Sequence, residues 1–486
     1  MSTIPIVVIF SYIAGVTAVG AAFARRTTSA RQWTVAGGGL GSGMLAVGLA
    51  GTRIGGAGTY GVAGDVVVGG VWYLWWYGFA TFLALATFGL FFARGYRRLG
   101  LQTVGEIFWL RYGSRRSQAL TSLCVQTLYL AVNVIEPYVI GAMLQALTGI
   151  PMVAGVAIAA VVLVSYTALG GLWGAAATNL IHSVVMLLGF LTVAVLGVEH
   201  LGGWAAMADA IDARLAGANR DLAAWWSPVG AGWVPIFGMI FAAAIHTPAA
   251  SIYANFSTAA RSPRLLLPGF VLGGVLAGLM PMLAGVIGMQ AAARYGFDAG
   301  LRGYANITAV AIDINPWAGS LALAAVLAAV ISSGGPVLLS SATMFVRDWL
   351  PVARHWSPDR KLRAYRLTTV VYGVLAAGLA WVAASRAVSL LDLLLVGYAM
   401  VVPPAIAVAF VMYWRRTTEA GAFWGTAAGY AAGLVWYAGP YHATGIDPSY
   451  VTTLVPLAAV PAVSLLTTDN RERAEAFYAR LAGKTT

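Results

Sequence analysis

The chain has 486 residues, of which 60% are apolar and 9% are charged, roughly a third of the charged fraction of an average soluble domain. This leaves too little polar surface to cover a water-soluble globule, which excludes a soluble enzyme, a nucleic-acid binder and a disordered protein. The net charge of +12 arises from short basic clusters between apolar runs, a pattern typical of cytoplasmic loops. We therefore interpret the chain as an integral membrane protein whose first partner is the lipid bilayer.

A helix needs about 20 predominantly apolar residues to cross the hydrocarbon core. The apolar runs, cut at charge clusters and at Pro and Gly breaks, predict an all-α protein with thirteen transmembrane helices. The first run has no basic residue before it and is long enough to span, so we expect a retained helix rather than a cleaved signal. The predicted spans are 4–24, 40–66, 71–93, 118–148, 150–168, 175–199, 231–254, 265–292, 316–346, 367–385, 389–413, 421–438 and 450–467.

The basic residues orient these spans. If the loop with Arg25, Arg26 and Arg31 is cytoplasmic, alternation of the thirteen spans places most of the 29 Lys and Arg residues on the same side. The positive-inside rule then predicts an N-terminus outside and a C-terminus in the cytoplasm, in the cell membrane. The longest connections are the loops near 200–230 and 347–366. A surface helix is expected in the first, and the tail at 469–486 is helical in composition.

The second span is interrupted by glycine. Five glycines occur among the eleven residues from Gly51 to Gly61, and each weakens a helix by up to about 1 kcal/mol relative to alanine. Unwound backbone at bilayer depth is tolerated where it lines a cavity or is buried in protein. Because these glycines flank Arg53, we favour a cavity over simple close packing of helices.

Ionisable residues inside spans are candidates for function, because inserting one costs about 2.5–3.5 kcal/mol. Arg53 is the clearest, and Glu136 in the fourth span is expected to be its counter-ion or a proton carrier. A fixed structural ion pair between the two is an equally open alternative. His246 lies at a second break, before Pro248, and is favoured as a substrate contact, whereas Tyr398 either lines the cavity or packs in the core.

Several motifs follow the Gly-rich span in a characteristic order, and together they resemble the sodium:solute symporter family. They are Trp72, Trp75-Trp76-Tyr77, Phe92-Ala93, Arg97-Arg98, Gly100, Thr103, Glu106, Arg111-Tyr112-Gly113, the run Tyr166–Leu172, the run Ala329–Ser333, Arg347-Asp348, Pro403, Trp414-Arg415-Arg416 and Gly421-Ala422.

The resemblance implies a LeuT-like core of two inverted five-helix repeats, each with a broken first helix. The chain would divide into a leading helix and loop (1–39), a first repeat (40–199), an extracellular loop (200–230), a second repeat (231–413), two peripheral helices (414–468) and a cytoplasmic tail (469–486). The substrate would lie between the two breaks. The expected substrate-binding residues are Arg53, Gly55, Gly56, Glu136, His246 and Tyr398.

The family also implies a sodium site, with no organic cofactor. Its ligands would be the backbone carbonyls of Gly51, Ile54 and Ala329 and the hydroxyls of Ser332 and Ser333. A hard cation prefers several oxygen ligands, and broken helices supply free carbonyls. The alternative is that the two serines bond only to their own helix.

The chain departs from the family at two positions beside this site. Arg53 adds a positive charge, and Asn179 stands where the family usually has aspartate. Each full charge is worth about 3–4 kcal/mol at 4–6 Å and an effective dielectric near 20. We therefore expect Arg53 either to bind an anionic group of the substrate or to replace the ion electrostatically.

These observations predict a symporter that imports a small polar organic solute by alternating access, with no enzymatic activity and no obligate protein partner evident. A carboxylate-bearing solute is favoured, because guanidinium binds carboxylate in a bidentate manner. The alternatives are proton-coupled or uncoupled transport, a cationic amine as substrate, and a solute sensor that does not transport.

Overall fold

The computed structural model describes residues 3–24, 29–469 and 471–483. Within these ranges the regular structure is helical, and the single β-type pairing is one isolated bridge between Leu40 and Ala260. The N-terminal elements are α1 (Ile4–Ala24), α2 (Ala30–Val35), η1 (Ala36–Gly38), α3 (Ser42–Arg53), η2 (Ala57–Gly61), α4 (Val62–Gly69), α5 (Trp72–Phe91), α6 (Ala93–Leu99), α7 (Glu106–Tyr112) and α8 (Arg115–Thr148). The middle elements are α9 (Met152–His200), α10 (Trp204–Gly217), α11 (Leu222–Trp226), α12 (Trp233–Ile245), η3 (Thr247–Ala249), α13 (Ser251–Ala259), η4 (Pro263–Leu265), α14 (Leu266–Tyr295) and α15 (Gly300–Ile314). The remaining elements are α16 (Pro316–Met344), η5 (Phe345–Trp349), η6 (Pro351–His355), α17 (Pro358–Ser385), α18 (Leu390–Tyr413), α19 (Glu419–Ala438), α20 (Pro440–Thr444), α21 (Pro448–Leu466) and α22 (Arg471–Ala482).

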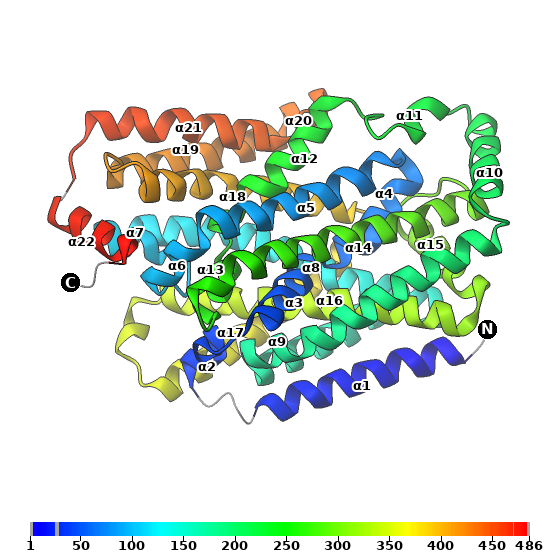
Figure 1. The fold of residues 1–486 in the computed structure, drawn as a ribbon, viewed down its shortest axis with the longest axis horizontal. Coiled ribbons are helices and arrows are strands. Elements are labelled where there is room, and N and C mark those ends of the chain that lie inside the picture. The colour runs from blue at the N-terminus through cyan, green and yellow to red at the C-terminus, as the bar shows by residue number, and fades with distance from the viewer. Residues whose placement is uncertain (1–2, 25–28, 470, 484–486) are drawn as a thin grey trace.

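The long helices run roughly along one common direction, as Figure 1 shows, with α10 at one end of the molecule and α6, α7 and α22 at the other. Each of the thirteen predicted spans coincides with a long helix, a bent helix or a broken pair. By length and apolar composition, eight described helices can cross a membrane, or nine if the bent pair α12–α13 counts as one span. The all-helical membrane fold is therefore confirmed, while the count of thirteen and the inverted repeat stay predictions.

The helices differ in how much of their surface is covered by protein. In α16 nearly every residue is buried, and α8 is buried over most of its length, whereas α17 and α21 expose most of their apolar residues. A helix that is apolar on all sides and fully covered belongs to the centre of a bundle. The exposed apolar residues of α17 and α21 instead identify helices at the lipid-facing periphery, where Figure 1 shows α21 with α19 along one edge.

Close packing at the centre depends on small residues. A Cβ on Gly78 of α5 would lie 2.7 Å from the carbonyl oxygen of Gly278 in α14, so these two helices approach closely enough to exclude any side chain between them. Gly171, with φ of 57°, bends α9 and separates the two spans that the sequence predicts on either side of it.

Two short segments follow the predictions and one helix was missed. The loop at 200–230 contains α10, and the tail forms α22. The missed helix is α15, which is half-buried and carries Arg302 and Asp313. Its 15 residues are too few to span and too polar to be separated from a loop by hydropathy.

Candidate functional site

Both predicted helix breaks are present. Helix α3 ends at Arg53, and Ile54 is extended, with φ of −95° and ψ of 109°, before the chain turns into the π-helical segment η2. The second break separates α12 from α13, whose axes differ by 54°. Such breaks leave backbone N–H and C=O groups free to contact other groups, which is the usual basis of a binding site at bilayer depth.

Arg53 connects the two breaks. Its side chain is 5% exposed, and its guanidinium donates from Nη2 to the carbonyl of Ala243 at 2.8 Å and faces His246 Nε2 across 3.3 Å from Nη1. Nη1 also lies 3.5 Å from the hydroxyl of Tyr253. The Nε–H has no partner among the described residues. One edge of the guanidinium is thus held by α12 and α13, while Nε keeps a free donor.

The rings of His246 and Tyr398 stack face to face beside the guanidinium. Their rings are stacked at 4.0 Å between centroids and 10° between planes, and the Arg53 Cζ lies 4.8 Å from the Tyr398 centroid. His246 Nδ1 lies 2.6 Å from the carbonyl of Ala242 and must donate there. Nε2 is therefore the unprotonated nitrogen that accepts from Arg53, which fixes a neutral tautomer.

Glu136 does not pair with Arg53 within the described residues. Its Oε2 accepts the backbone N–H of Gly56 at 2.9 Å, and its Oε1 accepts the hydroxyl of Ser333 at 2.6 Å. A Cβ on Gly55 would lie 2.2 Å from Glu136 Oε1, so a glycine is required for the broken helix to approach this carboxylate. The geometry removes the alternative of a fixed Arg53–Glu136 ion pair, because the open helix offers the carboxylate a nearer donor.

Four of the five expected sodium ligands lie together where the end of α3 packs against α16. The Ser332 hydroxyl lies 3.0 Å from the Gly51 carbonyl and 2.9 Å from the Ala329 carbonyl, and the Ser333 hydroxyl lies 2.9 Å from the same Ala329 oxygen. These oxygens come from α3 and α16, which are far apart in sequence. Ser333 also bonds to Glu136, so both serines contact groups beyond their own helix.

Asn179 lies against this cluster. Its Nδ2 donates to the carbonyl of Gly48 at 3.3 Å, and a Cβ on Gly51 would lie 2.9 Å from the same nitrogen. Its Oδ1 is buried with no partner among the described residues. The amide is thus a neutral neighbour of the oxygen cluster, at the position where the sequence resemblance implies an aspartate.

A cavity of about 30 Å³ lies where these groups meet, with room for one or two water molecules. It brings together Arg53, Gly55, Glu136, Ser333 and Tyr398 from the predicted set. Gly56 and His246 do not line the cavity, but Gly56 bonds to Glu136 and His246 contacts Arg53, which do. Sequence reasoning missed Tyr253 as an Arg53 contact. The sequence feature that could have identified it is an aromatic residue seven positions after His246, in a stretch of mostly small side chains.

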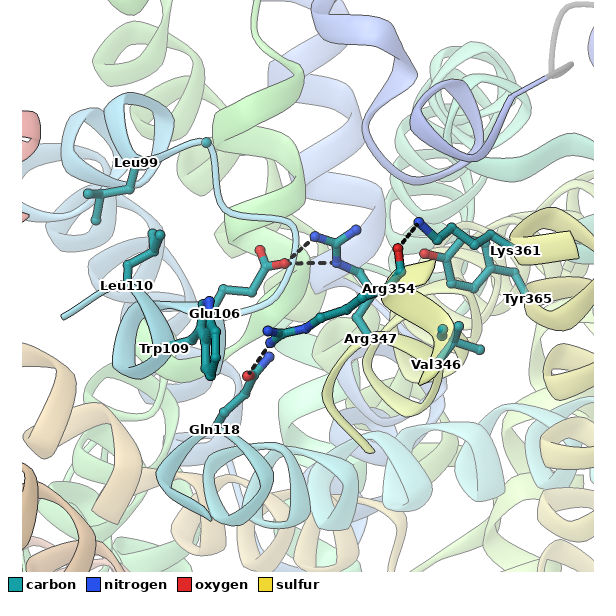
Figure 2. A pocket seen from close by; sticks show the side chains of 12 residues that line it. Leu99, Glu106, Trp109, Leu110, Gln118, Val346, Arg347, Arg354, Lys361 and Tyr365 are labelled. Atoms are coloured by element: carbon teal, nitrogen blue, oxygen red, sulfur yellow. Dashed lines mark hydrogen bonds and ion pairs between the residues drawn. The ribbon is translucent and has the colours of Figure 1, made fainter. Parts of the chain in front are cut away.

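A second, larger cavity of about 400 Å³ lies at the end of the bundle that carries α6 and α7, and Figure 2 shows its lining. Glu106 and Arg347 form an ion pair across it, and Arg354 donates to Gln118 at 3.2 Å. The adjoining Asp348 accepts from Thr103 and Gln118 at 2.8 and 2.7 Å. These contacts join the segment after α5 to the end of α16, two regions that the sequence motifs had marked separately.

A helical membrane protein with two broken helices facing one buried charged site is a secondary transporter in architecture. Among solved structures, the fold is similar to the outward-open state of a Na⁺-coupled sialic acid symporter, with a TM-score of 0.79 and 19% identity over 96% of this chain and 99% of that one. It is also similar to MhsT in complex with L-phenylalanine, with a TM-score of 0.57 and 14% identity over 87% and 97% of the two chains.

The model of the sodium:solute symporter family matches residues 33–429, and the chain belongs to this family. It is 26% identical to the human sodium/glucose cotransporter 4 over 82% of this chain and 61% of that protein. It is 24% identical to the uncharacterized symporter YwcA of Bacillus subtilis, over 88% and 84%. It is also 24% identical to a sodium/proline symporter of Staphylococcus aureus, over 61% and 58%. The chain thus spans about three-fifths of the length of the human relative, and these relatives are transporters rather than enzymes.

Proposed function

We propose that the protein imports a small carboxylate-bearing solute together with Na⁺ by alternating access across the cell membrane. The observation that carries this proposal is the guanidinium of Arg53, which is buried at the helix break and keeps its Nε–H unpaired. Nη2 has given one hydrogen to Ala243 and retains a second. Nε and Nη2 form the edge of guanidinium that binds a carboxylate with two parallel hydrogen bonds.

Sodium coupling is supported by the family and by the oxygen cluster of Gly51, Ala329, Ser332 and Ser333. The carbonyl of Ile54, next to the break, completes the proposed ligand set. The positive charge of Arg53 opposes a cation in this region, so we place the substrate anion between them. A carboxylate on Arg53 would cancel that repulsion, which an uncharged sugar would not.

A cationic amine fits less well, because it would have to enter beside a buried guanidinium. The relatives are named for glucose and proline transport, so a sugar and an amino acid are the natural comparison substrates. Uptake measured under a sodium gradient and under a proton gradient distinguishes sodium coupling from proton coupling and from uncoupled transport. Accumulation of the solute above its external concentration distinguishes a transporter from a sensor.

A ligand screen of the purified protein tests the substrate class. Thermal unfolding in detergent is measured with acetate, lactate, pyruvate, proline, glucose and choline, each in NaCl and in KCl. We expect stabilisation by one or more of the monocarboxylates and a larger shift in NaCl, because a ligand stabilises the state that it binds. Stabilisation by glucose or choline but by no carboxylate would contradict the proposal.

We propose that the Glu106–Arg347 ion pair holds the cytoplasmic end of the bundle closed. The basic residues of the loops predict that this end is the cytoplasmic one. We expect Glu106→Gln to favour opening at this end. The reporter is Ser340→Cys in a Cys124→Ala background, because Ser340 is fully buried on α16 two turns inside Arg347. Labelling by a membrane-impermeant maleimide should become about tenfold faster in Glu106→Gln.

The matched control is Glu419→Gln, which removes the carboxylate of another ion pair, with Arg116, that joins α8 to α19 outside this cavity. It should leave the labelling rate of Cys at position 340 unchanged. Equal acceleration by both substitutions would show general loosening of the bundle, and no acceleration by Glu106→Gln would refute the assigned role.

A further inference from the structure

Two opposite charges line the central cavity without touching each other. Arg53 and Glu136 are 5% and 1% exposed, and both border the same cavity. The polar contacts of Arg53 are His246, Tyr253 and a carbonyl, and those of Glu136 are an amide N–H and a hydroxyl. A buried charge without an opposite charge is costly. Neither charge has an opposite charge in contact among the described residues, and the space that a ligand would occupy is bordered by both.

Glu136 is also linked to the proposed sodium ligands. Its Oε1 is 2.6 Å from the Ser333 hydroxyl, which is 2.9 Å from the Ala329 carbonyl. The same carbonyl lies 2.9 Å from the Ser332 hydroxyl. Glu136 is the one acidic side chain that lines this cavity among the described residues. A negative charge thus reaches the oxygen cluster from the Ser333 side, while Asn179 on the Gly51 side is neutral.

We propose that Arg53 and Glu136 couple the substrate to sodium electrostatically, with Glu136 supplying the negative charge of the cation site. The proposal rests on the function proposed above. Without substrate, the guanidinium offsets the carboxylate and sodium binds weakly. A substrate carboxylate on Arg53 neutralises the guanidinium, so Glu136 becomes an uncompensated charge and draws Na⁺ to Ser332, Ser333 and the neighbouring carbonyls.

The coupling is reciprocal by thermodynamic linkage. If bound substrate raises the affinity for sodium by some factor, bound sodium raises the affinity for the substrate by the same factor. The scheme therefore makes a prediction for protein without any substrate. Removing the charge of Arg53 should mimic the bound anion and tighten sodium binding, although the same change destroys the substrate site.

The test is binding of ²²Na⁺ to the purified full-length protein at constant pH, with no organic substrate present. We expect Arg53→Gln to tighten sodium binding at least tenfold and Glu136→Gln to weaken it at least tenfold. The matched control is Asp65→Asn, an acidic residue of α4 in the same broken helix that does not line the cavity. It should bind sodium within twofold of the unmodified protein.

A relocation of the charge separates an electrostatic role of Glu136 from a structural one. Asn179→Asp places a carboxylate beside Gly51, on the opposite side of the oxygen cluster, and should restore sodium binding to the Glu136→Gln protein. Glu136→Gln binding sodium as tightly as the unmodified protein, or Arg53→Gln failing to tighten it, would overturn the proposal. If Glu136→Gln does not fold, the Arg53→Gln measurement decides alone.

The outcomes also distinguish this inference from the proposed function. Stabilisation by a carboxylate in NaCl, together with unchanged sodium binding in Arg53→Gln and Glu136→Gln, would leave the transport function and refute the role of Glu136. Sodium binding that responds as expected, with no carboxylate recognised, would support Glu136 as the negative charge of the cation site and refute both the substrate class and its coupling to sodium through Arg53.

Discussion

Replacing Arg53 by glutamine is expected to reduce uptake of the carboxylate substrate at least a hundredfold. The substitution removes the charge and the Nε and Nη2 donors that the proposed carboxylate needs, and Arg53 itself is only 5% exposed to solvent. Losing a buried charge-assisted pair of hydrogen bonds costs roughly 3 kcal/mol or more, and about 1.4 kcal/mol corresponds to a factor of ten. Initial rates of labelled-substrate uptake into proteoliposomes measure the effect.

Arg53→Lys sharpens this test, because it keeps the positive charge and loses the planar pair of donors. We expect its apparent affinity to fall at least tenfold while some uptake remains. Arg302→Gln is the control, since Arg302 is exposed on α15 and pairs with Asp298 four residues away. Uptake by Arg53→Gln at the unmodified rate would remove Arg53 from the substrate site.

Replacing Ser332 by alanine is expected to raise the sodium concentration for half-maximal uptake at least tenfold. Its hydroxyl lies between the carbonyls of Gly51 and Ala329, at 3.0 and 2.9 Å. It is therefore the side-chain oxygen that joins the ligands of α3 to those of α16. A small cation that has lost its hydration shell depends on each remaining oxygen. The measurement is uptake as a function of external NaCl at constant ionic strength.

Ser341→Ala is the matched control on the same helix. Its hydroxyl is buried and bonds to the Val337 carbonyl of α16 rather than to α3. It should leave the dependence on sodium unchanged. Equal shifts in the two variants would indicate a general effect of the substitution on α16 and contradict the assignment of Ser332 to the ion site.

The breaks themselves were predictable from local chemistry. Glycines at 55 and 56 and a proline at 248 weaken helices wherever they occur in a sequence, and the structure interrupts α3 and α12 beside them. The convergence of Ser332 with Gly51 came from the family resemblance, because the two residues are 281 positions apart. No periodicity in the sequence places them together.

The partners of the charged residues were harder to predict. Arg53 and Glu136 are opposite charges in the second and fourth predicted spans, and the sequence left an ion pair between them open. The actual partner of Glu136 is the free N–H that appears when the helix opens at Gly56. The carboxylate takes that donor, and the guanidinium takes Ala243 and His246 from the other break. Side-chain direction at a break follows from tertiary packing, which spacing along the chain does not encode.

The central claim is that a carboxylate and Na⁺ enter together through the site at Arg53. Its most direct test is uptake of a labelled monocarboxylate, chosen by the thermal screen, into proteoliposomes with an inward Na⁺ gradient, and in parallel with an inward K⁺ gradient and with an inward proton gradient. We predict accumulation above the external concentration with the Na⁺ gradient alone. Equal uptake under all three gradients, or accumulation driven by protons without sodium, would contradict the account.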